Sequence, residues 1–231
     1  MDIPEAVRRD LEAIAELKRY YAWKSALLSP HLGRRVVEVG CGNGLMLEQL
    51  GDRELLAGAE PDGFLAGEAK RRLGGRAEVR QVDVMAPEFL SFAEARPDTV
   101  LFVNVLEMVP DDRAALRQAR SILVPEGKVV VLASALPSLQ GELDRSFGQR
   151  RYGRGEFHRL LESEGFRVSS LRYANLLGAL GWWLDSKVMK RREMTAVDYR
   201  RRDRMVPFAR LLDALTGPPI GRLLLGVGIK T

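Results

Sequence analysis

Apolar residues along the chain recur in two alternating patterns. Short β-rich runs, among them the continuous stretches 36–37 and 129–132, predict strands that are buried on both faces. Segments with three-to-four apolar spacing follow several of these runs and predict helices. The alternation predicts an α/β fold with a parallel sheet between layers of helices. We expect strands at residues 35–39, 55–59, 77–82, 99–103, 128–133, 166–173 and 222–230, and helices at residues 44–51, 62–73, 111–123 and 154–165.

Helical patterns outside this alternation occupy two further segments. Residues 4–29 carry apolar side chains at three-to-four spacing, and Pro30 stops the pattern. Residues 174–221 are helical in pattern and rich in Lys and Arg, with Pro207 among the residues that punctuate them, and they interrupt the strands before the last one. We therefore expect one domain of 231 residues with three parts: a helical brace (1–30), a sheet core (31–173 and 222–231) and a helical cap (174–221).

The composition narrows the class of protein. Cys41 is the only cysteine, which excludes an intramolecular disulfide and favours a cytoplasmic protein. His31 and His158 lie far apart, and no paired-cysteine spacing occurs, so we expect no metal site. The first residues lack the apolar run of a signal peptide, and the longest apolar stretch, 174–184, is shorter than the roughly 20 residues that span a membrane.

Charge is distributed unevenly along the chain, whose formal net charge is +5. Residues 135–231 hold 18 Lys and Arg against 10 Asp and Glu, a difference of +8, whereas residues 1–134 hold 18 against 21, a difference of −3. A basic C-terminal part is typical of proteins that meet an anionic substrate, a membrane surface or a nucleic acid, and equally of solvated helix faces. Charge alone leaves these alternatives open.

A glycine-rich turn joins the first expected strand to the next helix. Residues 38–44 read Glu-Val-Gly-Cys-Gly-Asn-Gly. Glycines allow positive φ and a close approach of the main chain to a ligand, and the helix start presents unpaired N–H groups. A dinucleotide fingerprint requires its third glycine at the sixth position, which is Leu45 here, so a nicotinamide cofactor is disfavoured.

Carboxylates follow the next two expected strands. Glu60 ends the second strand and Asp83 ends the third. The carboxyl ends of parallel strands meet at one edge of a sheet, where ligands of open α/β sheets bind. A carboxylate after the second strand can accept hydrogen bonds from both hydroxyls of a ribose, and Asp83 could accept one from an adenine amino group.

These three segments resemble the first three motifs of class I S-adenosylmethionine-dependent methyltransferases: Glu-Val-Gly-Cys-Gly-Asn-Gly (38–44), Ala-Glu-Pro-Asp (59–62) and Val-Asp-Val (82–84). Residues 104–107, 122–127 and 150–152 resemble later landmarks of the small-molecule branch, types 11 and 12, and the resemblance covers about residues 20–173 and the terminal strand. It implies a Rossmann-like, seven-stranded, mostly parallel sheet with an antiparallel last strand. It also implies S-adenosylmethionine as the cofactor, with S-adenosylhomocysteine as its product.

The resemblance further implies which residues bind the cofactor. The loop glycines would line the methionine part of the cofactor. The carboxylate after the second strand would bind the ribose, and the residues after the third strand would line the adenine. Asn104 would lie beside the sulfonium. The expected set is Tyr21, Glu38, Gly40, Cys41, Gly42, Gly44, Glu60, Pro61, Asp83, Val84, Asn104 and Val105.

Methyl transfer from a sulfonium is an in-line displacement, which positioning and a dry site can accelerate without a covalent catalyst. Many relatives carry histidine where this chain has Met108 and Gln149, so no imidazole base is present at either place. If the acceptor must lose a proton, we expect Glu107 or Tyr152 to take it, with Asp144 as a further candidate.

Other residues could contact the acceptor or cover the cofactor. Arg151, beside Arg150, could bind an acidic acceptor, although surface pairing explains both equally well. Trp182 and Trp183 supply apolar area in the expected cap, which could act either as a lid or as a buttress of the sheet. The N-terminal aromatic residues, which are Tyr20, Tyr21 and Trp23, could fold over the cofactor.

Three functional hypotheses follow. The first is methyl transfer to the oxygen, nitrogen or carbon of a small-molecule acceptor. The second is a lipid or isoprenoid methyltransferase at a membrane surface, suggested by the apolar run 176–184 and the basic residues after it. The third is a catalytically silent cofactor-binding module, suggested by the missing histidines. We expect no nucleic-acid partner, because no aromatic-basic interleaving occurs. A monomer and a homodimer both stay open, as does peripheral membrane contact.

Overall fold

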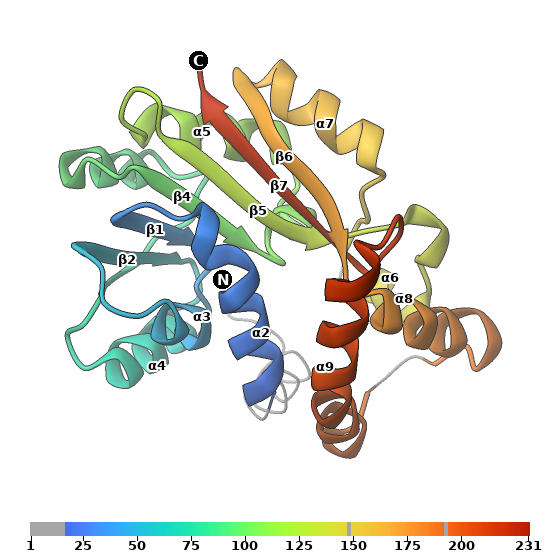
Figure 1. Cartoon of the computed structure of the whole chain (residues 1–231). Helices are drawn as coiled ribbons and strands as arrows, with labels where there is room; N and C mark the ends of the chain where they lie inside the picture. The colour runs from blue at the N-terminus through green and yellow to red at the C-terminus, as the bar shows by residue number, and fades with distance from the viewer. Residues whose placement is uncertain (1–16, 147–148, 192–193) are drawn as a thin grey trace.

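The protein forms a seven-stranded sheet with the order β3-β2-β1-β4-β5-β7-β6 (Figure 1). The structure is a computed structural model of the whole chain, and it describes residues 17–146, 149–191 and 194–231. The strands are β1 (Arg35–Val39), β2 (Leu55–Glu60), β3 (Glu78–Gln81), β4 (Thr99–Val103), β5 (Lys128–Ser134), β6 (Phe166–Ala174) and β7 (Leu223–Lys230). Strands β1 to β5 pair in parallel, and β7 runs antiparallel between β5 and β6. The expected fold class, including the antiparallel last strand, is confirmed.

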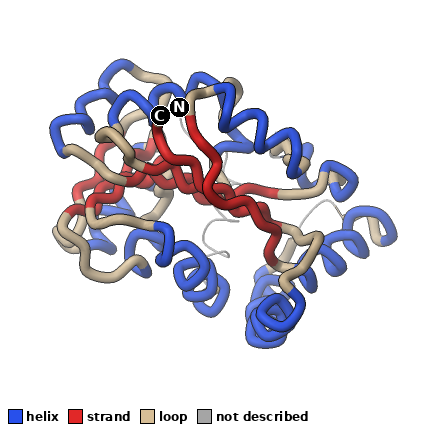
Figure 2. Tube along the Cα trace, turned by 45° about the horizontal axis from the view of Figure 1, so that its top comes forward, coloured by secondary structure: helices blue, strands red, loops and turns tan. Residues whose placement is uncertain are grey.

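Helices lie on both sides of the sheet (Figure 2). The α-helices are α2 (Lys18–Leu28), α3 (Leu45–Gln49), α4 (Gly63–Leu73), α5 (Asp112–Ile122), α6 (Glu142–Ser146), α7 (Arg154–Ser163), α8 (Leu176–Trp183) and α9 (Ala196–Thr216). The 3₁₀-helical segments are η1 (Ser29–His31), η2 (Pro87–Ala95), η3 (Leu106–Met108) and η4 (Pro137–Leu139), and η5 (Leu184–Val188) is π-helical.

The continuous apolar runs are explained by burial on both faces of the central strands. On β4, Val100 and Phe102 pack into a core cluster that includes residues of η2, α5 and α7. Leu101, between them, packs on the other face into a cluster with residues of α2, α3 and α4. On β5, Val131 likewise packs into the first cluster, and its neighbour Val130 packs into the second cluster on the other face. Successive side chains of a strand point to opposite faces, so a strand covered twice must be apolar at every position.

The strand order places the loops that carry the sequence motifs at one edge. Strand β1 pairs with β2 on one side and with β4 on the other, so the direction of the strand order changes between β1 and β4. Such a switch point leaves a crevice outside the carboxyl ends of the strands. The turns that follow β1, β2, β3 and β4 meet there.

Helix α9 of the cap forms hydrogen bonds both with the N-terminal brace and with α8. The carboxylate of Asp203 accepts hydrogen bonds from the N–H groups of Arg19, at 3.3 Å, and Tyr20, at 2.9 Å, near the first turn of α2. The carboxylate of Asp213 accepts one from the N–H of Leu176, at 3.1 Å, in the first turn of α8. Helix N-termini have N–H groups without intrahelical partners, so these carboxylates stabilise both helix starts. Brace and cap are thereby held beside each other.

Most expected elements agree with the structure to within one or two residues. The expected helix over residues 4–29 is seen from Lys18 to Leu28, and residues 4–16 lie outside the described part. Pro207 does not interrupt the cap, because α9 continues through it. A proline inside a helix removes one N–H donor, and the caps at both ends of α9 keep the rest of the helix in place. The segments η2 and α6 were not predicted.

Two further findings concern only the described residues. No helix among them is long and apolar enough to cross a membrane. No group of three or more His, Cys, Asp or Glu side chains among them could hold a metal ion.

Candidate functional site

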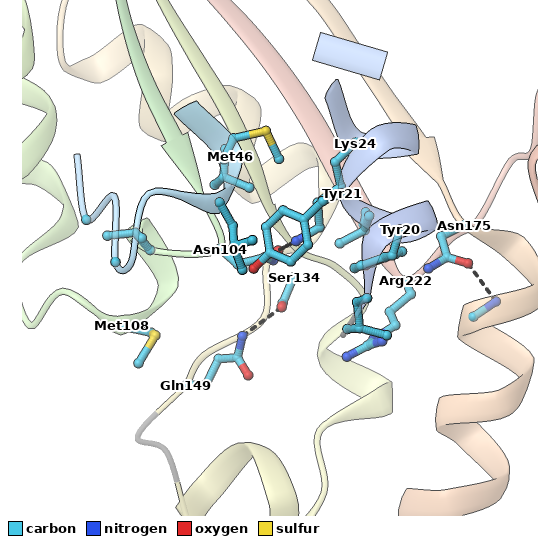
Figure 3. A pocket seen from close by; sticks show the side chains of 18 of the residues that line it. Tyr20, Tyr21, Lys24, Met46, Asn104, Met108, Ser134, Gln149, Asn175 and Arg222 are labelled. Carbon is cyan, nitrogen blue, oxygen red and sulfur yellow. Dashed lines mark hydrogen bonds between the residues drawn. The ribbon is translucent and has the colours of Figure 1, made fainter. Parts of the chain in front are cut away.

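A cavity of about 960 Å³ lies at the carboxyl edge of the sheet, between α2, the cap and the turns after β1 to β4. Figure 3 shows side chains of α2 gathered there with Asn104, Ser134 and Arg222. Eleven of the twelve expected cofactor residues line it: Tyr21, Glu38, Gly40, Cys41, Gly42, Glu60, Pro61, Asp83, Val84, Asn104 and Val105. The structure therefore brings the turns after four different strands into one site.

The glycines of the β1 turn have different tasks. Gly40 and Gly42 both have positive φ, at 66° and 54°. A Cβ on Gly40 would meet the side chain of Val105 at 2.6 Å, so this glycine allows the β1 and β4 turns to approach each other. A Cβ on Gly42 would meet nothing within 4 Å, and Gly42 lines the cavity. The open space beside Gly42 is where a ligand could approach the main chain.

Gly44 does not line the cavity, which corrects the expectation that it binds the cofactor. It has φ of 79° at the start of α3, and a Cβ there would meet Ala69 and Leu73 of α4 at 3.2 Å. Its role is to turn the chain into α3 and to let α3 pack closely on α4. The spacing of the three glycines could not separate a packing glycine from a ligand-facing one.

Glu60 connects the β2 end with the β1 turn. Its Oε2 accepts a hydrogen bond from the N–H of Gly42 at 2.8 Å, and its Oε1 accepts one from the N–H of Asp62 at 3.0 Å. Burial raises the pKa of this carboxyl, and the two backbone N–H groups oppose that shift. A carboxylate has about four acceptor positions, so both oxygens can still accept hydrogen bonds from a ligand in the cavity.

The β3 turn supplies the wall on the other side of Glu60. Asp83 is exposed, and its Oδ1 accepts a hydrogen bond from the N–H of Met85 at 2.8 Å, which shapes the turn. Val84 is buried and belongs to the main core cluster. A carboxylate beside an apolar side chain suits a flat, polar-edged group such as a purine.

Glu38 is a buried acid with an unpaired oxygen. Its side chain lines the cavity from β1, and its Oε2 has no hydrogen-bond partner among the described residues. Burial raises the pKa of Glu38 to about 8, with Lys24 opposing and Glu60 adding to the shift. An unpaired buried acceptor is costly, so this atom is suited to a cationic or hydrogen-donating ligand group.

Asn104 stands at the end of β4 in an unusual backbone conformation. It has φ of 56°, which asparagine tolerates better than most residues. Its Nδ2 donates to Glu107 Oε1 at 3.1 Å, and its Oδ1 accepts a hydrogen bond from Lys24 Nζ at 2.7 Å. Strained backbone at the edge of a cavity is typical of functional sites.

Glu107 lies behind the cavity wall and not in it. The residue is fully buried, and its Oε1 also accepts hydrogen bonds from the N–H of Ser134, at 2.9 Å, and from Gln149 Nε2, at 3.2 Å. The cavity is lined by Asn104, Ser134 and Gln149 instead. The expectation of Glu107 as a proton acceptor is therefore corrected: its contacts make it a residue that orients its neighbours.

Tyr152, the other expected base, is also away from the cavity. Its hydroxyl donates to Asp112 Oδ2 at 2.8 Å, and the side chain is buried in the main core cluster. Burial and the Asp112 carboxylate both raise the pKa of Tyr152. A buried phenol that already donates its proton to a structural carboxylate cannot take the proton of an acceptor in the cavity.

Arg151 and Asp144 form a buried ion pair outside the cavity. Arg151 Nη2 lies 2.8 Å from Asp144 Oδ1, and neither side chain is accessible to solvent. Asp144 Oδ2 accepts a hydrogen bond from Trp182 Nε1 at 3.3 Å. The expectations of Arg151 as an acceptor-binding residue and Asp144 as a base are corrected, because neither residue lines the cavity and the two are buried against each other.

The two cap tryptophans of α8 differ in burial. Trp182 is buried and lines the cavity. Trp183 is 52% exposed and does not line it, which corrects that expectation. Adjacent residues of a helix lie about 100° apart around its axis, so one of a neighbouring pair commonly points away from a shared site.

Five basic residues line the cavity, and none of them was expected there: Lys24 of α2, Arg191, Arg201 and Arg202 of the cap, and Arg222 before β7. A signal for Lys24 was present, because Leu17, Tyr21 and Lys24 follow the apolar three-to-four spacing, on which a lysine is unusual. No local pattern marked Arg222.

Comparisons with known proteins agree with this geometry. The ubiquinone biosynthesis O-methyltransferase of Bordetella avium (strain 197N) is 30% identical over 134 residues, covering 54% of this chain and 52% of that protein. The chain spans about half the length of the curated relatives it matches. A solved possible histamine N-methyltransferase from Thermotoga maritima is similar with a TM-score of 0.66 and 16% identity, over 97% of this chain and 96% of that one.

A second solved structure shares the fold at lower identity. Geranyl diphosphate C-methyltransferase from Streptomyces coelicolor A3(2), in complex with Mg²⁺, geranyl diphosphate and S-adenosyl-L-homocysteine, has a TM-score of 0.62 and 14% identity, over 90% of this chain and 77% of that one. The family described as "Methyltransferase domain" matches residues 8–182, well over half of the sequence. The chain therefore belongs to the methyltransferase-domain family.

Proposed function

We propose that this protein transfers the methyl group of S-adenosylmethionine to a small-molecule acceptor, at an oxygen atom. The observation that carries the proposal is that Glu38, Gly42, Glu60 and Asp83 line the same cavity at the switch point of the sheet. The oxygen acceptor is supported by the O-methyltransferases among the relatives.

The lining residues fit such a cofactor. Glu38 Oε2, which lacks a partner among the described residues, would accept hydrogen bonds from the ammonium group of the methionine part. The open face of Gly42 leaves room for that part, and Glu60 would accept hydrogen bonds from the ribose hydroxyls. Asp83 and Val84 would hold the adenine. When bound, the cofactor would supply an electrophilic methyl group next to a good leaving group.

The protein itself would contribute position and a dry environment. The cavity is bounded by buried side chains from α2 and α8, including Trp23 and Trp182, which keep water away from the reacting atoms. Holding two reactants in line is worth up to about 7–11 kcal/mol of the barrier in favourable systems. The absence of an imidazole at Met108 and Gln149 is therefore compatible with turnover.

We propose that the brace, the sheet core and the cap act as one domain, with the cap as the acceptor-side lid. Support comes from Trp182, Leu177 and Val206, which extend the cavity from the cofactor end onto α8 and α9. The cap then determines which acceptors fit, and the sheet edge holds the cofactor.

Binding and turnover test this function separately. Isothermal titration with S-adenosylhomocysteine should show a single site, and a panel of phenols, amines and carbon acids should then be screened for S-adenosylhomocysteine formation. Turnover confined to hydroxyl acceptors is the expected result. A folded protein that does not bind S-adenosylhomocysteine would contradict the proposal, and binding without turnover on any acceptor would favour the silent module.

Peripheral membrane contact is a second candidate property, favoured by the outer face of α9. Phe208, Leu211 and Leu215 are more than half exposed at helical spacing, and the exposed Arg204 and Arg210 lie among them. Such a face can enter the interface of an anionic membrane from a cytoplasmic location.

Cosedimentation with vesicles of phosphatidylcholine alone, or mixed with phosphatidylglycerol, tests the contact. Binding that requires the anionic lipid and is lost in F208S/L211S is expected. Leu90→Ser, on an exposed residue of η2, is the matched control. Equal vesicle binding by the wild-type protein, F208S/L211S and L90S would contradict membrane contact through α9.

A further inference from the structure

Lys24 is a buried lysine in the wall of the cavity. It is 5% exposed, and its Nζ lies 4.7 Å from the ring centre of Tyr20 and 5.0 Å from that of Tyr21. Within the described residues it forms no ion pair, and its hydrogen bond runs to the neutral amide oxygen of Asn104. Lysines are rarely buried without a carboxylate partner, so this position requires an explanation.

The hydrogen-bond network determines how the Lys24 nitrogen is oriented. Glu107 Oε1 can only accept from Asn104, so the Asn104 amide must present its oxygen to Lys24. Lys24 therefore donates one N–H at 2.7 Å to that oxygen. In the neutral amine, the lone pair of Nζ is then free for a proton donor in the cavity.

Arg222 is another cation in the wall of the same cavity. Its guanidinium carbon lies 4.0 Å above the ring of Trp182, and it makes no ion pair with any carboxylate of the described chain. Figure 3 shows Arg222 and Lys24 on either side of Tyr20, in the part of the cavity that Asn104 borders. A guanidinium stays charged at any ordinary pH, so Arg222 is a permanent cation without an anion.

The surroundings of Lys24 favour its neutral form. Burial lowers the pKa of Lys24 to about 7, and the positive charge of Arg222 adds to the decrease. Glu107 and Glu38 oppose it, as do the rings of Tyr20 and Tyr21, which attract a cation. The result is an amine that is free to take a proton near neutral pH.

We propose that Lys24 accepts the proton of an ionisable hydroxyl on the methyl acceptor, and that Arg222 binds the oxyanion that forms. This inference deepens the proposed function and rests on it. The O–H bond breaks, its proton joins the Nζ lone pair, and the oxygen keeps the electron pair. That pair then forms the bond to the methyl carbon while the carbon–sulfur bond breaks with its electrons on sulfur. Lys24 returns the proton to water after the product leaves.

The pair of cations also indicates the class of acceptor. Proton transfer is efficient when the pKa values of donor and base are within a few units of each other. A phenol, with a pKa of about 10 in tyrosine, meets that condition for the Lys24 amine. An aliphatic alcohol does not, because its oxyanion is far too basic. The acceptor that fits is a phenol, an enol or a hydroxyl of similar acidity.

The first test follows Lys24 directly, without turnover. In protein labelled with ¹³C at lysine Cε, one resonance should titrate near pH 7, and it should be absent from K24M. In R222M the titration midpoint of the Lys24 resonance should rise, because the positive charge of Arg222 no longer repels the protonated amine. R222K should restore the low midpoint. Titration of every lysine resonance near the ordinary value of about 10.4 would overturn the inference.

The second test uses 4-nitrophenol as the probe, with protein saturated by S-adenosylhomocysteine. Absorbance of the phenolate at a pH below the probe's own midpoint should rise on binding. That rise should vanish in K24M, and affinity should fall at least ten-fold in R222M. Lys70→Met, an exposed lysine of α4, is the control. Probe binding without a rise in phenolate absorbance would overturn the inference.

Titration of S-adenosylhomocysteine into the same samples separates the two proposals. Failure of the wild-type protein to bind it contradicts the proposed function, whatever the Lys24 midpoint. Normal binding together with an ordinary Lys24 midpoint contradicts only the role of Lys24.

Discussion

The carboxylate of Glu60 accepts a hydrogen bond from the backbone N–H of Gly42 at 2.8 Å. The residue that ends β2 thus holds the turn that follows β1, and both face the same cavity. A ligand that binds Glu60 is therefore coupled to the shape of the glycine turn.

Glu60→Ala should weaken S-adenosylhomocysteine binding by about 1.5–3 kcal/mol, the usual scale for hydrogen bonds to a charged group. That corresponds to roughly ten- to hundred-fold in Kd. Glu60→Gln keeps the shape and one acceptor oxygen, so its loss should be smaller. Isothermal titration measures both, with circular dichroism to verify folding. A change below two-fold in the folded Ala variant would show that other residues hold the ribose.

Gly42→Val should abolish cofactor binding, because the branched side chain would enter the open space of the cavity. The positive φ of 54° adds strain of about 1–2 kcal/mol. Gly51→Val is a matched control, since Gly51 also has positive φ, at 72°, and open space, but lies away from this cavity. Both variants should lose similar thermal stability, and only Gly42→Val should lose S-adenosylhomocysteine binding. Equal affinity of Gly42→Val and Gly51→Val for S-adenosylhomocysteine would contradict a role of Gly42 in cofactor binding.

Glu38 should make the stability of the free protein depend on pH. Its pKa in the folded state is about 8, above the ordinary value of 4.5, so its neutral form is the one that folding favours. The contribution of Glu38 to the free energy of unfolding is present in full below about pH 4.5 and is lost as the pH rises towards 8. The free energy of unfolding of Glu38→Gln minus that of wild type should therefore increase from pH 5 to pH 8. Urea denaturation at several pH values checks it, and a constant difference would count against the buried, neutral carboxyl.

We also expect Glu38 to release a proton when the cofactor binds. If its carboxylate pairs with the ammonium group of the ligand, its pKa falls and a proton is released near pH 7. Titration calorimetry of S-adenosylhomocysteine in buffers of different ionisation enthalpy should detect this release, and Glu38→Gln should lack it. The same release in the variant would assign the proton to another group.

Trp182→Ala should impair acceptor turnover while leaving S-adenosylhomocysteine affinity nearly unchanged, because the cofactor is held by the sheet edge. Loss of a buried tryptophan also costs about 3–5 kcal/mol of stability, so Trp182→Phe is needed as a milder variant. Trp183→Ala is the control, since this neighbour is exposed and should change stability by no more than about 0.5 kcal/mol. Reduced thermal stability with normal acceptor kinetics in both Trp182 variants would make the cap a buttress and not a lid.

Much of this architecture is determined by local sequence. The continuous apolar run of β5 is predictable because each strand position faces a covered side of the sheet. Glu60 and Asp83 could be assigned to one edge from sequence alone, since parallel strands place their carboxyl ends together. The turn at Gly40 and Gly42 is likewise encoded locally, in residues that tolerate positive φ.

Only the tertiary structure decided which polar residues reach the cavity. Glu107, Tyr152 and Arg151 carry suitable chemistry in suitable places along the chain, and each is buried against partners that come from other segments. Lys24 and Arg222 come from opposite ends of the chain and share one cavity, because α2 packs beside the cap and β7 returns between β5 and β6. A local pattern describes the face a side chain takes on its own element. What that face meets, and hence whether its charge is paired, solvated or exposed to a ligand, depends on contacts between distant segments.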